Sequence, residues 1–330
     1  MDPAPNTPPA TVLITGANGF IGSALGDALQ RRGHAVVRAV RTPRGSGCVS
    51  VGDIGPDTDW TPALRGVDHV IHTAARVHVI EDHATHPEAA YRAVNVDGTR
   101  RLAEQAAAAG VQRLVFLSSI KVNGETTGVD AATAFTAFDA PNPADAYARS
   151  KWAAEQALHD VAARTELQVT VVRPPLVYGP GVQANFARLV RLVARGLPLP
   201  LGAVDNRRSL AALDNLVDLL IRCLDHPSAA GQTFLASDGQ DLATPELICL
   251  IARAMDRPAR LLPMPPAMLR WGGALTGKSA VVARLLDSLR IDLAHTRSTL
   301  DWAPPVSPRE AIHRAVQPMP QTARASKSRA

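Results

Sequence analysis

Near the start of the chain, residues 11–33 read TVLITGANGFIGSALGDALQRRG. A short apolar run that favours a β-strand leads into Gly16, Gly19 and Gly22, and a helical pattern follows. In such a unit the first glycine permits a tight turn, the second lets the backbone approach a pyrophosphate, and the third allows the helix to pack closely on the sheet. The helix N-terminus then faces the anion. The stretch predicts a dinucleotide-binding strand–loop–helix unit; the alternative is an ordinary glycine-rich turn.

The rest of the chain repeats this alternation of strands and helices. Apolar runs at 34–40, 49–54, 68–77, 113–120 and 168–179 are separated by helical patterns. The alternation predicts an α/β fold with a Rossmann-type doubly wound parallel sheet. Pro174 and Pro175 interrupt the last of these runs, so we expect it to end at an edge or a cofactor-facing turn.

From about residue 181 the pattern changes to shorter helices, a Pro-rich loop and one further strand at 232–237. We expect a smaller C-terminal α/β cap that binds substrate, with some later segments crossing back to the first domain. The predicted organisation is a flexible leader (1–10), the cofactor domain (11–180), mainly cap (181–316) and a flexible tail (317–330).

Composition disfavours several classes of partner. The 330 residues are 46% hydrophobic and only 4% aromatic, with a net charge of +5. Because the arginines are scattered and aromatic platforms are few, we expect an anionic small ligand rather than nucleic acid. The spacing of the three cysteines resembles neither a metal site nor a disulfide framework, which favours a reduced cytosolic setting. We expect no signal peptide and no membrane insertion, and hence a cytoplasmic protein.

The segment AYARSKWAAEQAL (146–158) places Tyr147 and Lys151 four residues apart on one face of a predicted helix. A phenol beside an ammonium can exchange protons near neutral pH, and we expect the lysine to lower the pKa of the tyrosine. The alternative is a pair of surface residues without chemistry.

Four further residues bear on the cofactor. An NAD site usually has an acidic residue at the end of the second strand, where this chain has Arg41. Arginine suits a 2′-phosphate, so we expect NAD(P)(H) with NADPH slightly favoured, unless Arg41 and Arg44 are only solvated. Asp53 follows the third strand and is a candidate adenine contact, and Ala74 and Ala75 are small enough to let backbone pass the cofactor.

Five histidines do not form a ligand pattern. They lie at positions 69, 72, 78, 83 and 86 without a spacing such as H-E-x-x-H, so we expect no metal site.

Together the segments TGANGFIG, GDI, VIHTAA, FLSSIKVNG, YARSK and RPPLVYGPG resemble the extended short-chain dehydrogenase/reductases, in their nucleotide-sugar epimerase/dehydratase branch. The resemblance covers about residues 11–315. It implies that Tyr147 is the acid/base, that Lys151 binds the nicotinamide ribose, and that Ser119 bonds the reacting sugar oxygen. The cofactor residues it implies are Gly16, Gly19, Phe20, Ile21, Gly22, Arg41, Asp53, Ile54, Ala74, Ala75, Tyr147, Lys151 and Pro174.

The resemblance also implies a set of substrate contacts. Asn185 and Arg208 fall where the family holds the diphosphate, and Leu199 falls in the loop that holds the base. Lys121 and Asn123 replace residues common in epimerases and are expected to face the sugar. The full set is Ser119, Lys121, Asn123, Asn185, Leu199 and Arg208.

These substrate contacts have simpler alternatives. Ser119 could cap a turn. Asn185 could cap a helix. Arg207 and Arg208 could be solvated, and so could Lys121. We expect Asn95 to bond the backbone of a neighbouring strand and so to support the site.

The resemblance implies a nucleotide-sugar oxidoreductase acting at C4 of a UDP-hexose or UDP-hexosamine, in the supply of surface-polysaccharide or O-antigen sugars. Because Arg41 replaces an acid, NAD(P)H-dependent reduction of a 4-keto sugar is favoured, with UDP-sugar 4-epimerisation as the alternative. A non-catalytic NADP(H)-binding sensor is the remote alternative. By family analogy we expect a homodimer formed through residues 87–110 and 145–165.

Overall fold

The computed structural model describes residues 9–42, 47–77 and 87–317. The predicted leader and tail lie almost wholly outside these residues, as do Arg44, His78, His83 and His86.

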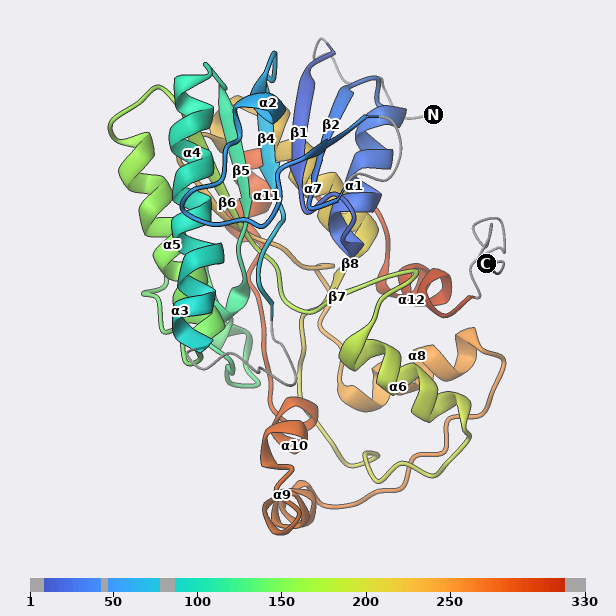
Figure 1. Cartoon of the computed structure of the whole chain (residues 1–330). Coiled ribbons are helices and arrows are strands. Elements are labelled where there is room, and N and C mark those ends of the chain that lie inside the picture. Colours follow the sequence, from blue (N-terminus) through green and yellow to red (C-terminus); the bar gives the residue numbers. More distant parts are fainter. Residues whose placement is uncertain (1–8, 43–46, 78–86, 318–330) are drawn as a thin grey trace, which may run out of the picture.

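Seven parallel strands form the central sheet, in the order β3-β2-β1-β4-β5-β6-β9 (Figure 1). The chain builds outward from β1 in one direction and then returns to build outward in the other. This reversal puts the switch point at the carboxyl ends of β1 and β4, where such sheets bind ligands. The strands are β1 (Thr11–Thr15), β2 (Ala35–Val40), β3 (Cys48–Ser50), β4 (His69–His72), β5 (Arg113–Leu117), β6 (Gln168–Arg173) and β9 (Thr233–Leu235). The predicted doubly wound parallel sheet is confirmed.

Helices cover both faces of this sheet. On one face, Leu25, Leu29 and Leu220 belong to a core shared by α1, α7 and the strands. On the other, Leu102 and Leu158 belong to a second core shared by α2, α4 and α5. The helices of the sheet domain are α1 (Phe20–Arg31), α2 (Thr61–Leu64), α3 (Pro87–Tyr91), the π-helical turn η1 (Arg92–Asp97), α4 (Gly98–Ala108), α5 (Ala146–Ala162), α7 (Leu213–Asp225) and α11 (Ala294–Leu300). Short 3₁₀ turns lie at η2 (Ile120–Val122), η3 (Ala131–Thr133) and η4 (Pro227–Ala229).

The strand predicted at 232–237 was wrongly placed in the cap. Its central residues form β9, which pairs in parallel with β6 as the edge of the main sheet. Helix α7, which precedes it, packs against α1 and not in the cap. Some later segments were expected to cross back to the first domain, but apolar residues alone do not say which core a segment joins, so the sequence did not identify this strand as one of them.

The prolines end β6 as expected, since proline cannot donate to a strand ladder. Strand β6 stops at Arg173, and the chain re-forms a short strand, β7 (Val177–Tyr178), which pairs with β8 (Ala211–Ala212). The remaining helices have a separate apolar core and lie below the sheet in Figure 1. They are α6 (Ala184–Ala194), α8 (Thr244–Ala254), α9 (Pro266–Leu275), α10 (Ser279–Leu286) and α12 (Pro308–Val316). No helix among the described residues is long and apolar enough to cross a bilayer.

Candidate active site

The glycine loop, which turns from β1 into α1, leaves no room for a side chain at Gly16 or Gly22. Gly16 adopts a φ of +67°, and a Cβ there would lie 2.9 Å from the backbone of Ala74. A Cβ at Gly22 would lie 2.3 Å from the carbonyl oxygen of Gly16. The first turn of α1 follows Gly19, which caps it without a side chain. A backbone-lined loop at a helix N-terminus fits a dinucleotide pyrophosphate.

We expect Gly22→Ala to weaken NAD binding by at least about tenfold, because the added methyl meets backbone that must move. Isothermal titration of the purified chain with NAD measures the effect. Gly272→Ala in α9 is the matched control, since a Cβ there meets nothing within 4 Å and the residue is also helical. NAD affinity that is unchanged in Gly22→Ala would contradict this role of the loop.

The residues that follow the carboxyl end of β4, Thr73–Arg76, lie opposite the glycine loop and form what we call the β4 wall. The backbone N–H of Ala74 donates to Thr15 Oγ1 at 3.2 Å, and Thr73 Oγ1 donates to the Thr15 carbonyl at 2.6 Å. Asn95 lies in the π-helical turn and bonds both the N–H and the C=O of Arg76, at 2.8 and 3.0 Å. Its amide also donates to Ser150 Oγ at 2.9 Å. The expectation that Asn95 bonds neighbouring backbone is confirmed, and this residue joins the β4 loop to α5.

Tyr147 and Ser119 lie close together next to the β4 wall, and Lys151 follows Tyr147 one turn along α5. Asp145 caps α5 by accepting from the Ala148 N–H at 2.7 Å. The side chain of Ser119 accepts from the Lys121 N–H at the start of η2, as the turn-capping alternative proposed. It also forms a side-chain hydrogen bond with Tyr147. The structure therefore brings the phenol and the serine hydroxyl together.

The pKa of Tyr147 is raised to about 12, chiefly by burial and also by the charge of Asp145. The hydrogen bond with Ser119 acts in the opposite direction. The expected lowering by Lys151 was wrong in direction, because desolvation of the phenolate dominates and the lysine is not among the causes. The protein's own groups thus hold Tyr147 as a neutral phenol, the form that donates a proton.

Lys151 is buried, with its Nζ 4.0 Å from the centre of the Phe116 ring. Burial lowers the pKa of Lys151 to about 7, and the carboxylate of Glu155 partly offsets this. The ammonium therefore gains or loses its proton close to neutral pH, which makes its charge responsive to any ligand beside it.

A buried ion pair that the sequence analysis missed lies one helical turn beyond Lys151. Arg173 and Glu155 are 4% and 0% exposed, and the Arg173 Nε donates to Glu155 Oε1 at 3.0 Å. Glu155 also accepts from Ser118 Oγ. Because residues 147, 151 and 155 are spaced by four, the helical pattern itself could have shown that Glu155 shares their face.

Asn123 is the fourth member of this cluster. Its Oδ1 accepts from the Arg173 guanidinium at 3.0 Å, and its Nδ2 donates to the Thr136 carbonyl at 2.9 Å. The side chain is buried. The structure gives Asn123 protein partners on both polar atoms, whereas the sequence analysis expected it to face the sugar.

Lys121 has acidic partners rather than open solvent. Its ammonium lies 2.5 Å from Asp145 Oδ2 and 2.8 Å from Glu125 Oε1. Burial lowers the pKa of Lys121, but the bonds to the two carboxylates outweigh burial and raise it overall. Lys121 thereby connects η2 to the N-terminus of the helix that carries Tyr147.

The two residues expected at the adenosine end form an ion pair with each other. Arg41 Nε lies 2.6 Å from Asp53 Oδ1, and both side chains are largely exposed. Ile54 is half-buried and packs against Gly98 of α4. Arg41 therefore already has a carboxylate beside it.

The expected substrate residues of the cap lie on separate segments. Asn185 is exposed within the first turn of α6, where Gln183 and not Asn185 is the cap, so the capping alternative was wrong. Leu199 is half-buried and pairs through its backbone with Leu261. Arg208 is half-buried, donates to the Asp287 carbonyl at 2.8 Å, and has its pKa lowered by burial.

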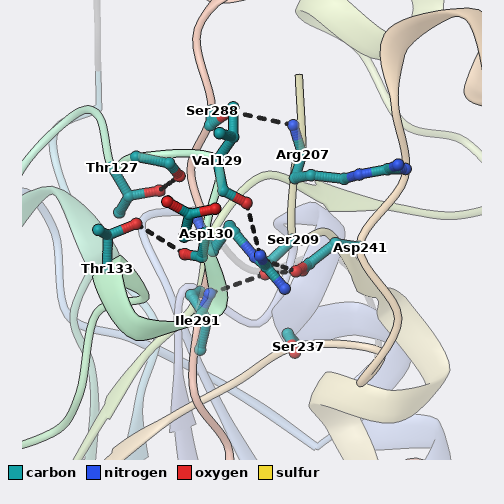
Figure 2. Close-up of polar contacts among 12 residues, drawn as sticks. Thr127, Val129, Asp130, Thr133, Arg207, Ser209, Ser237, Asp241, Ser288 and Ile291 are labelled. Atoms are coloured by element: carbon teal, nitrogen blue, oxygen red, sulfur yellow. Dashed lines mark hydrogen bonds and ion pairs between the residues drawn. The ribbon is translucent and has the colours of Figure 1, made fainter. Parts of the chain in front are cut away.

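Residues 287–292 are hydrogen-bonded to neighbouring segments on both sides. Ser288 Oγ accepts from the Arg207 N–H at 3.1 Å, and Ser209 Oγ accepts from the Ile291 N–H at 2.9 Å (Figure 2). On the other side the Thr127 N–H donates to the Ser288 carbonyl at 2.9 Å. The segment thereby joins the cap to the loop that follows η2.

His72 is a structural residue. Its ring nitrogens contact the hydroxyls of Thr15 at 2.6 Å and Thr99 at 2.9 Å, and burial lowers its pKa to about 3. Within residues 9–42, 47–77 and 87–317, no group of three or more metal-ligating side chains is found.

Comparison with known proteins places this geometry in context. Residues 12–236 match the model of the NAD dependent epimerase/dehydratase family. A UDP-glucose 4-epimerase of Vibrio cholerae is 44% identical over 314 residues, which cover 94% of this chain and 95% of that protein. The structure of MoeE5 in complex with UDP-glucuronic acid and NAD is 27% identical, with a TM-score of 0.73 and coverage of 93% and 97%. The fold also matches that of a UDP-glucuronic acid 4-epimerase from Bacillus cereus, with a TM-score of 0.74, 19% identity and coverage of 93% and 97%.

Proposed function

Because this chain belongs to the NAD dependent epimerase/dehydratase family, we propose that it is a UDP-sugar 4-epimerase that works with NAD. The observation that carries the proposal is the 44% identity to a UDP-glucose 4-epimerase over nearly the full length of both proteins. The same similarity favours epimerisation, the alternative in the sequence analysis, over the 4-keto reduction that was preferred there. A role in surface-polysaccharide sugar supply is part of the same proposal.

The proposed cofactor site runs along the carboxyl edge of the sheet. The glycines of the β1–α1 loop would hold the pyrophosphate beside Ala74 and Ala75, and Asp53 with Ile54 would hold the adenosine. Lys151 and Pro174 would lie at the nicotinamide end. When bound, NAD accepts a hydride from sugar C4 and returns it.

The protein's own groups would manage the proton on the sugar O4 oxygen. Tyr147 would receive that proton during oxidation and return it during reduction, while Ser119 holds the oxygen by a hydrogen bond. Positive charge at Lys151 and at an oxidised nicotinamide would oppose the burial that raises the pKa of Tyr147. Asn185, Leu199 and Arg208 are the proposed contacts to the UDP part of the substrate.

The 4-keto reductase remains the second candidate, because Arg41 stands where NAD-preferring sites carry an acid. Two incubations separate the candidates. Purified protein with NAD should interconvert UDP-glucose with UDP-galactose, or UDP-GlcNAc with UDP-GalNAc, with no net change in reduced nicotinamide absorbance. If these sugars stay unchanged while a UDP-4-keto-6-deoxy-N-acetylhexosamine consumes NADPH, the protein is the reductase.

The ion pair between Arg41 and Asp53 supports NAD as the preferred cofactor. Asp53 Oδ1 lies 2.6 Å from Arg41 Nε. A 2′-phosphate bound at Arg41 would therefore be repelled by the negative charge of the Asp53 carboxylate. We expect Asp53→Asn to shift the ratio of NADP to NAD affinity towards NADP by roughly tenfold. The ratio, measured by titrating both nucleotides, separates this effect from any general loss of adenosine binding.

The double variant Asp53→Asn with Arg41→Ala is the control, since it removes the freed guanidinium and should abolish the gain for NADP. An unaltered ratio in Asp53→Asn would show that the pair does not set the cofactor preference.

A further inference from the structure

The charge of the molecule is concentrated on one part of the cap. Residues 194–200 and 257–286 contain six arginines and lysines and no aspartate or glutamate. These two segments therefore carry +6, although the whole chain carries only +5. All six basic side chains are exposed, and they belong to residues 195, 257, 260, 270, 278 and 284.

The two segments lie side by side. The Leu199 N–H donates to the Arg260 carbonyl at 2.8 Å, and the Gly202 N–H donates to the Leu262 carbonyl at 2.9 Å. The Arg257 guanidinium donates to the Ala194 carbonyl at 2.6 Å. The second segment then continues into α9 and α10, which lie at the end of the molecule away from the sheet (Figure 1). We call residues 194–200 and 257–286 the basic surface.

The same surface exposes an unusual number of large apolar side chains. Of the eleven exposed large hydrophobic residues in the described part of the chain, six lie on the basic surface. Met268, Trp271 and Leu275 are 57%, 70% and 68% exposed and are spaced i, i+3 and i+7 along α9. They form one stripe on the helix. Apolar stripes of this kind on a soluble protein mark a binding surface.

The opposite side of α9 is the side that packs. A Cβ at Gly273 would lie 2.7 Å from a methyl group of Val282, so α9 and α10 cross closely there. Leu269 and Leu285 join the cap core. The helix is thus held by its small and apolar inner residues, and its outer stripe contributes nothing to that core.

We propose that the basic surface docks on an anionic phospholipid bilayer, with the Met268–Trp271–Leu275 stripe entering the headgroup region. Tryptophan and leucine are typical of the apolar face of helices that lie at the boundary between headgroups and acyl chains, and nearby arginines and lysines attract anionic lipid. Long basic side chains can keep their charges at the headgroups while their stems cover apolar surface. This is binding at the membrane surface and needs no spanning helix.

The charge and the apolar stripe together favour an anionic bilayer over a second copy of the chain or a nucleic acid as the partner of the basic surface. A two-fold contact with a second copy would place six basic residues against the same six, which repel. A nucleic acid would satisfy the charge but would leave the apolar stripe in contact with phosphates and water. Among the described carboxylates, Asp287 pairs with Arg270 at 2.7 Å, and none pairs with Arg260, Lys278 or Arg284. An anionic bilayer satisfies both the charge and the stripe.

Sedimentation with vesicles tests the proposal on the full chain. We expect binding to vesicles in which about a third of the lipid is phosphatidylglycerol, no binding to pure phosphatidylcholine, and weakening at high salt. The triple variant Met268→Ser, Trp271→Ser, Leu275→Ser and the double variant Arg260→Glu, Lys278→Glu should each bind at least about tenfold more weakly.

Matched controls come from other faces of the molecule. Phe138→Ser removes the most exposed aromatic side chain, at 76%, and Arg100→Glu with Arg101→Glu reverses two charges on α4. Both should bind vesicles like the unchanged chain, and melting temperatures verify that every variant folds. Absence of binding to anionic vesicles, or equal binding by the triple variant, overturns the proposal. The proposal is also overturned if the unchanged chain is a dimer, the triple variant is a monomer, and neither binds vesicles.

Fluorescence gives a second measurement that does not depend on loss of binding. Trp60 and Trp302 are buried and Trp152 is half-buried, so Trp271 is the exposed reporter. Its emission should shift to the blue on anionic vesicles, and Trp271→Phe should remove the shift while the protein still sediments. A shift that persists in Trp271→Phe would overturn the proposed contact.

Discussion

Replacing Tyr147 by phenylalanine is expected to lower turnover of UDP-sugar by about 10²–10⁴-fold while leaving NAD binding unchanged. The phenol is the group that Ser119 bonds and that the helix begun at Asp145 presents beside the β4 wall. With the hydroxyl removed, no neighbouring acid replaces it, because Lys151 packs on Phe116 and Lys121 is paired with two carboxylates. Single-turnover and steady-state rates on the same preparation measure the loss.

The melting temperature of Tyr147→Phe with and without NAD is the control for folding and for cofactor binding. The edge contact between the rings of Tyr147 and Tyr91, with centroids 6.3 Å apart, survives the substitution. Turnover within a few-fold of the unchanged chain would show that Tyr147 is not the acid/base and would revive the non-catalytic alternative.

The second large effect is expected in stability, at the buried ion pair beside the site. In Glu155→Gln a neutral amide replaces the carboxylate that pairs with Arg173. The Arg173 side chain is only 4% exposed, so its charge is then buried without a counter-charge. Leaving a buried charge uncompensated costs about 3–5 kcal/mol. Denaturant unfolding should register this loss, and Arg173→Met added to Glu155→Gln should recover part of it, because the unpaired charge is then gone.

The same substitution changes a pH dependence. Glu155 raises the pKa of Lys151, which burial lowers to about 7, so its removal should lower that pKa further. In the proposed mechanism the protonated form of Lys151 is the active one, and its population falls as the pH rises through the pKa. The alkaline limb of the pH–rate profile should therefore move to lower pH.

Glu104→Gln on the exposed side of α4 is the matched control for both effects and should change stability by less than about 0.5 kcal/mol. An unfolding free energy and a pH profile that are both unaltered in Glu155→Gln would show that the pair supports neither the fold nor Lys151.

Features written in short local patterns could be predicted from the sequence. The convergence of Ser119 with Tyr147 was implied by the family resemblance, whereas the glycine loop and the parallel alternation follow from residues close in the chain and from the rule that parallel strands end at one edge. That rule also places the carboxyl ends of β2 and β3 together. The ion pair between Arg41 and Asp53 could therefore have been predicted from the sequence, although the sequence analysis did not predict it.

Features that depend on burial or on distant partners could not be predicted in the same way. The raised pKa of Tyr147 reflects desolvation, which no spacing reveals. The partners of Asn123, at Thr136 and Arg173, come from separate segments, so a polar residue near the serine looked like a sugar contact. The position of β9 in the main sheet likewise could not be predicted, because its apolar residues fit the core of the sheet domain and the core of the cap equally well.

In the proposed reaction, one bound nicotinamide would take a hydride from C4 of a UDP-sugar and give it back to the same carbon. The direct measurement uses UDP-glucose deuterated at C4, incubated with the protein and NAD in ordinary water, with the product analysed by NMR and mass spectrometry. We predict UDP-galactose that retains the deuterium at C4, with none in the free nicotinamide pool. Loss of the label to solvent or to free nicotinamide, or a net reduced sugar as the product, would contradict the proposed epimerisation.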